Sequence, residues 1–210
     1  MINNIINRLR FTFPGLLAVL LIFAAAPVSA GSATAVISDF NKNLLTVMQS
    51  AEKLGYDGRY AKLKPSVKAT FDLDFMTRYS AGRHWKRLTK EQKSQLVNAF
   101  SRLTIATYAD RFKGYSGEKF HIIKEETPRK GTRLVRTELE KSDGERVKLN
   151  YLLRSQKKDH WKIIDVFVKG TISELSTKRS EYSSTLKNKG LKGLLAILEK
   201  KISVLGAKSS

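Results

Sequence analysis

The sequence has 210 residues, 41% of them hydrophobic, and carries a formal net charge of +20 with no cysteine. This composition excludes disulfides, thiolate metal ligands and cysteine redox chemistry, so the folded chain depends on packing alone. The positive charge predicts an anionic partner, either a lipid surface or a nucleic acid. For any single lysine solubility is the simpler explanation, so only the total charge supports this argument.

Residues 1–30 predict a secretory signal peptide. Two arginines and no acidic residue precede an apolar run from Leu16 to Ala26, and Val28 to Ala30 provides small residues for cleavage. The run is shorter than the ~20 residues of a membrane-spanning helix, which makes an uncleaved anchor the weaker alternative. Cleavage after Ala30 leaves one domain, residues 31–210, and removal of the two arginines lowers the charge from +20 to +18.

For an exported protein, the expected anionic partner of this positive charge is a membrane surface. Outside the bacterial cytoplasm the abundant polyanions are anionic lipid headgroups and lipopolysaccharide, and each Lys or Arg near such a surface contributes ~1 kcal/mol. We therefore expect a periplasmic protein that meets an anionic membrane surface and binds no nucleic acid.

Three helices are expected in the first half of the mature chain. Apolar residues recur at three- and four-residue steps over residues 32–54, and Gly55 ends this pattern. Pro65 is expected to open a second helix that runs to Gly82, with a kink or a new cap at Asp72–Asp74; a cap explains these two acids more simply than a cation site. Thr89 and Gln92 have the spacing of a capping box, which predicts a long helix ending at Gly114.

The second half of the chain changes to strand-like periodicity. Four segments that alternate with turn residues predict antiparallel strands at 119–126, 132–140, 145–154 and 160–170. The last strand is apolar on both faces and should be central or covered twice. Helices at 171–190 and 190–206 complete the chain. The predicted fold class is α+β, a four-stranded antiparallel sheet covered by N- and C-terminal helices.

The motifs of catalysis and metal binding are mostly missing from the sequence. The three histidines have no metal-ligand spacing, and Glu118 stands where a nucleophile elbow over residues 114–118 requires glycine. We expect no catalytic residue, no metal site and no cofactor. Asp165 needs a partner, because a carboxylate on an apolar strand face is costly to bury. A structural ion pair with Arg179 is the favoured interpretation, and a general base in an isomerase-like enzyme is the alternative.

Residues 66–120, 147–154 and 161–201 together resemble the MlaC-type periplasmic phospholipid-binding proteins, also called the toluene-tolerance family. The branch associated with hopanoid biosynthesis, HpnM, is the most similar. The residues that carry the resemblance are Phe71, Asp72, Gly82, Trp85, Thr89, Gln92, Phe100, Tyr108, Tyr115 to Glu118, Tyr151, Trp161, Asp165, Gly170, Ser173, Arg179, Gly190, Leu191 and Leu194. Two departures, an extra residue between Gly170 and Ser173 and a tyrosine at Tyr182, suggest that the cargo differs from ordinary glycerophospholipid.

The resemblance implies a carrier that shuttles phospholipid, or a hopanoid-type lipid, between an inner-membrane ABC transporter complex and an outer-membrane lipid complex. Acyl chains would occupy an apolar cavity between sheet and helices. The expected lipid-binding residues, each of which is either cavity wall or plain core, are Phe75, Trp85, Phe100, Tyr108, Tyr151, Trp161, Phe167 and Ile172. A membrane-associated assembly or tethering factor without enzymatic activity is the main alternative.

Overall fold

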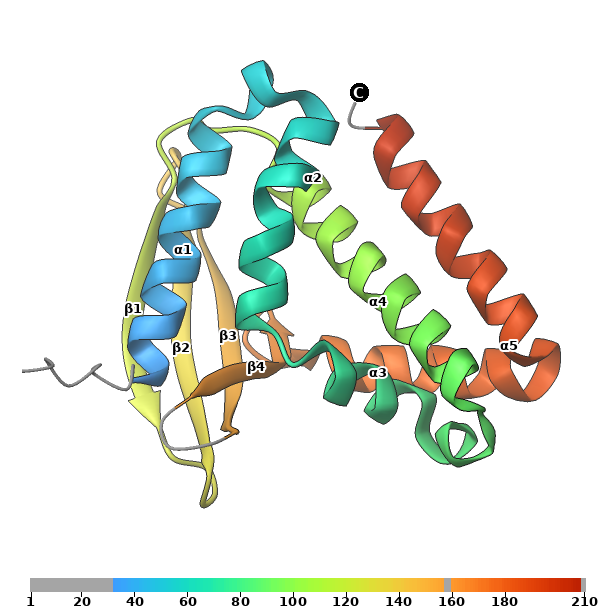
Figure 1. Ribbon diagram of the computed structural model, residues 1–210. Helices are drawn as coiled ribbons and strands as arrows, with labels where there is room; N and C mark the ends of the chain where they lie inside the picture. Colours follow the sequence, from blue (N-terminus) through green and yellow to red (C-terminus); the bar gives the residue numbers. More distant parts are fainter. Residues whose placement is uncertain (1–31, 157–159, 209–210) are drawn as a thin grey trace, which may run out of the picture.

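The computed structural model describes residues 32–156 and 160–208, in which helices precede and follow one antiparallel sheet (Figure 1). The helices are α1 (Ala33–Gln49), α2 (Ala51–Thr70), α3 (Leu73–Ala81), the 3₁₀ helix η1 (Gly82–Arg87), α4 (Lys90–Arg111) and α5 (Glu174–Lys208). The strands are β1 (Lys119–Glu126), β2 (Thr132–Glu140), β3 (Arg146–Ser155), β4 (Trp161–Val168) and β5 (Ile172–Ser173). The predicted α+β class is confirmed, while the expected signal peptide lies outside the described residues.

The sheet has five strands in the order β1-β2-β3-β4-β5, and each strand pairs antiparallel with the next. The prediction of four strands is corrected by β5, which pairs Ile172 and Ser173 with the end of β4. Lys169 and Gly170 both have positive φ, 53° and 82°, and this turn folds the chain directly back onto β4. A strand of two residues is too short to produce an alternating pattern in the sequence.

The first two helices differ from the predicted boundaries. The apolar stripe of α1 is buried as expected, but the helix ends at Gln49 and α2 begins at Ala51. Gly55, with a φ of 57°, interrupts α2 near its start. Pro65 lies inside α2 and does not open a helix, because Leu63 and Val67 on either side are fully buried and their packing retains the helix.

The two predicted N-terminal caps are both formed. The side chain of Asp72 accepts a hydrogen bond from the N–H of Phe75 and caps α3. Thr89 and Gln92 form the reciprocal capping box at the start of α4. The backbone N–H of Asp72 also donates to the carbonyl of Ile163 at 2.9 Å, so the junction of α2 and α3 is attached to strand β4. This attachment fixes Phe71 against the sheet.

Figure 1 shows α1 lying across one face of the sheet and the second half of α5 running back beside α4. Gly190, with a φ of 62°, makes the bend in α5, at the residue that the sequence placed between two helices. Leu194 and Leu198 in the second half of α5 are buried, and Glu199 forms a salt bridge to Arg102 of α4 at 2.6 Å. No helix in the described part of the chain is long and apolar enough to cross a membrane.

Gly82 ends α3 in a conformation that a side chain disfavours, with φ 56° and ψ −134°. A Cβ at this position would lie 3.2 Å from the hydroxyl of Ser183. We expect Gly82→Ala to lower the free energy of unfolding by about 2 kcal/mol, measured by urea titration. Gly114→Ala is the matched control, because a Cβ there meets nothing within 4 Å and the expected change is small. Equal losses in the two variants would contradict the prediction.

Candidate functional site

Five aromatic rings form a layer between the helices and the sheet. Phe40 of α1 lies 5.4 Å from both Phe71 and Tyr108, and 6.2 Å from Tyr151 of β3, measured between ring centroids. Tyr108 also stacks on Phe112 at 5.6 Å. All five side chains are buried. This group, called the aromatic layer below, brings together residues from four separate segments of the chain.

The aromatic layer contains two tyrosine hydroxyls. The hydroxyl of Tyr151 is buried, and the group it interacts with is the hydroxyl of the neighbouring Tyr108. Burial raises the pKa of the Tyr151 phenol well above its ordinary value, and the neighbouring Tyr108 adds to the effect. Close by on α1, the amide atoms of Asn41 are buried without partners among the described residues. Such groups cost free energy in a filled apolar core.

A small, partly open space, the inner hollow, borders the aromatic layer. Its volume is about 40 Å³, and Phe71 and Tyr108 form part of its wall. Met76 of α3 and Val166 of β4 provide further apolar lining. The inner hollow has room for about one water molecule, whose share of liquid volume is ~30 Å³. Its lining residues place the inner hollow where helices α3, α4 and α5 meet the sheet.

A larger groove lies between α4 and α5, with a volume of about 640 Å³. Its apolar wall consists of Leu103 from α4 with Ile197, Val204 and Leu205 from the second half of α5. Val204 is 41% exposed, so part of this apolar wall is open to solvent. We call this feature the α4/α5 groove. An exposed apolar surface in a concave site is typical of a place that receives an apolar ligand.

The α4/α5 groove and the inner hollow share four lining residues, Thr107, Arg111, Glu174 and Lys178. These residues, called the neck, stand where the two spaces meet. Glu174 accepts ion pairs from Arg111 at 3.0 Å and from Lys178 at 3.4 Å. Burial opposes ionisation of Glu174, but the two cations outweigh it and hold the pKa of this carboxyl below its ordinary value.

The lowered pKa of Glu174 predicts an acid-sensitive neck. Its carboxylate contributes stability above the ordinary value of 4.5, and this contribution is lost as the pH falls through the lowered pKa. In Glu174→Gln we expect the free energy of unfolding to fall less steeply with decreasing pH in that range than in the unmodified chain. Urea titrations at several pH values measure this. Glu52→Gln, at an exposed acid, is the control. A pH profile of Glu174→Gln that matched the control would contradict the role of the two ion pairs.

Two of the predicted lipid-binding residues, Tyr108 and Tyr151, come together between the helices and the sheet. Both belong to the aromatic layer, and Tyr108 also lines the inner hollow. Phe100 is buried elsewhere along α4, where its ring lies 6.2 Å from that of Tyr182 on α5. The first two therefore face the space between helices and sheet, and Phe100 packs between two helices.

The other five predicted residues lie apart from the aromatic layer. Phe75 and Trp85 line an open hollow of about 620 Å³, where the guanidinium of Arg154 lies 4.2 Å from the Phe75 ring. Trp161 stacks under Arg133, 5.1 Å from ring to guanidinium. Phe167 is half-buried at the end of β4, and Ile172 is 53% exposed on the edge strand β5. The eight residues thus do not line one cavity.

Asp165 and Arg179 do not form the predicted ion pair. The Asp165 carboxylate accepts hydrogen bonds from the N–H of Val166 at 2.8 Å, the hydroxyl of Ser173 at 2.6 Å and the N–H of Leu175 at 3.0 Å. Burial raises the pKa of Asp165 above its ordinary value, although these hydrogen bonds favour ionisation. Arg179 donates instead to the carbonyl of Tyr79 and lies over its ring. Asp165 therefore holds the first turn of α5 to β4.

Sequence reasoning missed most of the residues that surround these spaces. Leu103 and Thr107 belong to the apolar stripe of α4, so their helical spacing was visible in the sequence. Ile197 and Leu205 belong to a similar stripe in α5. Nothing in either stripe indicates that the two helices leave a groove between them, because that depends on how they cross.

Comparison with known proteins assigns the chain to a family. The family model described as MlaC protein matches residues 38–200, which is most of the chain, and the chain therefore belongs to the MlaC family. The chain is also similar to a solved structure, the phospholipid-binding protein from Ralstonia solanacearum in complex with a phospholipid. The identity is 19% and the TM-score 0.73, over 83% of this chain and 99% of that chain, so this likeness shows the fold. No curated protein matches the chain.

Proposed function

We propose that this protein binds phospholipid, with acyl chains in the α4/α5 groove and, past the neck, in an enlarged inner hollow. The observation that carries the proposal is the set of lining residues that the two spaces share. The inner hollow, at about 40 Å³, admits an acyl chain only if side chains of the aromatic layer move. The phospholipid complex of the Ralstonia protein and membership of the MlaC family support this function.

Apolar contact is sufficient for tight binding of such a ligand. Each buried methylene contributes ~0.8 kcal/mol, so two acyl chains supply ample affinity without a specific polar contact. Binding rather than catalysis is therefore the proposed activity. A hopanoid-type lipid is the proposed alternative cargo, in line with the resemblance to the hopanoid-associated branch.

We further propose a carrier role in the periplasm, after removal of residues 1–30. The protein would exchange lipid with an inner-membrane ABC transporter complex and an outer-membrane lipid complex. The charge of +18 that remains after this removal, from +20 less two arginines, favours encounters with anionic membrane surfaces on the way.

Lipid bound during expression tests the function directly. The chain from Gly31 to Ser210 is purified from bacterial periplasm without detergent, and native mass spectrometry is followed by solvent extraction and lipid analysis. We expect about one lipid molecule per chain, and its mass separates glycerophospholipid from hopanoid. A chain that carries no lipid and takes none from vesicles, when a known carrier does, would overturn the proposal and favour the tethering factor.

A further inference from the structure

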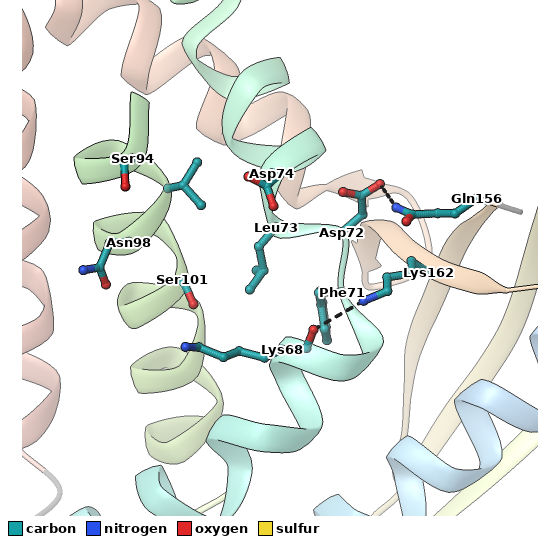
Figure 2. A pocket seen from close by; sticks show the side chains of 11 residues that line it. Lys68, Phe71, Asp72, Leu73, Asp74, Ser94, Asn98, Ser101, Gln156 and Lys162 are labelled. Atoms are coloured by element: carbon teal, nitrogen blue, oxygen red, sulfur yellow. Dashed lines mark hydrogen bonds between the residues drawn. The ribbon is translucent and has the colours of Figure 1, made fainter. Parts of the chain in front are cut away.

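A further hollow, of about 550 Å³, lies where the end of α2 and the start of α3 face α4 (Figure 2). Lys68 extends from α2 toward α4, and Lys162 extends from β4 toward the carbonyl of Lys68, 3.5 Å away. Ser94, Asn98 and Ser101 line the opposite wall from one face of α4. We call this feature the polar hollow. Its lining differs from the apolar wall of the α4/α5 groove.

The two lysines in the polar hollow have no acidic partner in the described part of the chain. Of the two carboxylates nearby, Asp72 is buried and engaged, because it accepts from Arg154 at 2.7 Å, from Gln156 and from the N–H of Phe75. Asp74 is exposed and pairs with no described cation. The lysines outnumber this one free carboxylate, so the polar hollow favours an anion.

Ser101 provides an independent indication of a ligand. This side chain lines the polar hollow and is only 6% exposed, yet its hydroxyl has no hydrogen-bond partner among the described residues. Buried hydroxyls are normally satisfied, and an unsatisfied one costs free energy. An anionic oxygen in the polar hollow would accept from Ser101 and from the lysine ammonium groups.

Phe71 connects the polar hollow to the rest of the site. Phe71 lines both the polar hollow and the inner hollow, so the two spaces meet at this residue. A phosphate in the polar hollow would thus lie next to the space proposed for acyl chains.

We propose that the polar hollow binds a phosphate group, held by Lys68, Lys162 and Ser101. The phosphate belongs either to a lipid headgroup or to a free phosphate ion, and in the first case the inference rests on the proposed function. Phosphate offers several strong acceptor oxygens, which match two ammonium groups and a hydroxyl.

The test compares two lipids with identical acyl chains, phosphatidic acid and diacylglycerol, which differ only in the phosphate. Their affinities for the chain are measured by vesicle-to-protein transfer, and inorganic phosphate is titrated separately by calorimetry. In Lys68→Gln/Lys162→Gln we expect the affinity for phosphatidic acid to fall at least roughly tenfold, because two charge-assisted contacts are lost. The affinity for diacylglycerol should not change. Lys64→Gln/Lys187→Gln removes the same charge outside the polar hollow and is the control.

Two single variants change the binding in opposite directions. Asp74→Asn should strengthen phosphatidic acid binding, because it removes the opposing charge. Ser101→Ala should weaken binding and leave the melting temperature unchanged or raised, because its hydroxyl has no partner to lose. This pairing separates a ligand contact from a structural role.

Each outcome has a distinct meaning. If Lys68→Gln/Lys162→Gln loses affinity for phosphatidic acid but not for inorganic phosphate, the polar hollow is a lipid headgroup site. If it loses affinity for inorganic phosphate but not for phosphatidic acid, the polar hollow is a site for free phosphate. If neither lipid binds the unmodified chain, the proposed function fails, while the phosphate titration still tests the polar hollow. Binding of both phosphate ligands that is unchanged in the double variant would overturn the inference.

Discussion

Replacing Ile197 and Val204 together by glutamate is expected to weaken phospholipid binding by about a hundredfold. Both side chains line the α4/α5 groove from the second half of α5. Two carboxylates there would remove contact with ~4 methylenes of an acyl chain, each worth ~0.8 kcal/mol, and a tenfold change in affinity corresponds to ~1.4 kcal/mol. Transfer of a fluorescent phospholipid from vesicles, measured against protein concentration, gives the affinity.

The matched control is Ala196→Glu/Ser203→Glu. These positions are each one residue before the groove positions, are exposed, and lie on the same half of α5, so the helix gains the same charge. The control should bind phospholipid like the unmodified chain. Equal weakening in the two double variants would show a general effect of charge on membrane encounter and would contradict the groove as the binding site. Circular dichroism checks that both variants retain their helices.

Helix starts were predictable from the sequence where a side chain caps them. The capping box at Thr89 and Gln92, and the cap at Asp72, involve residues three positions apart along the chain. Such local hydrogen bonds leave a visible motif. Pro65 was misinterpreted because packing of its buried neighbours retains the helix at that point, and packing has no local motif.

The candidate site was predictable only in part, because its residues come from distant segments. Tyr108 and Tyr151 were among the eight residues expected to bind lipid, and the fold places both in the aromatic layer. The α4/α5 groove depends on the direction that α5 takes after Gly190. The sequence marks that bend with a glycine but contains no signal for its direction, and so the groove was missed.

The ion pair predicted for Asp165 failed for a related reason. Its charge and burial were recognised correctly, but the sequence does not distinguish a cationic partner from backbone N–H groups. The turn at Lys169 and Gly170 brings Ser173 and Leu175 back to β4, and these residues supply the donors. The donors to Asp165 therefore come from the residues that follow this turn, and not from Arg179.

Removing the Asp165 carboxylate is expected to cause a large loss of stability. In Asp165→Ala the N–H groups of Val166 and Leu175 and the hydroxyl of Ser173 lose their acceptor. A buried donor without a partner costs ~1–3 kcal/mol, so we expect a loss of about 3 kcal/mol in unfolding free energy. For a chain of this size that corresponds to a fall of roughly 10 °C in the melting temperature, measured by calorimetry.

Asp165→Asn distinguishes the observed contacts from the ion pair that was expected. The amide keeps one acceptor oxygen, and it avoids the cost of burying a charge that raises the pKa of Asp165. We therefore expect a loss of about 1 kcal/mol, well below that of Asp165→Ala. Asp57→Ala, at an exposed acid, is the control and should change little. Equal, large losses for the asparagine and alanine variants would mean that the negative charge itself stabilises the fold, as an ion pair would require.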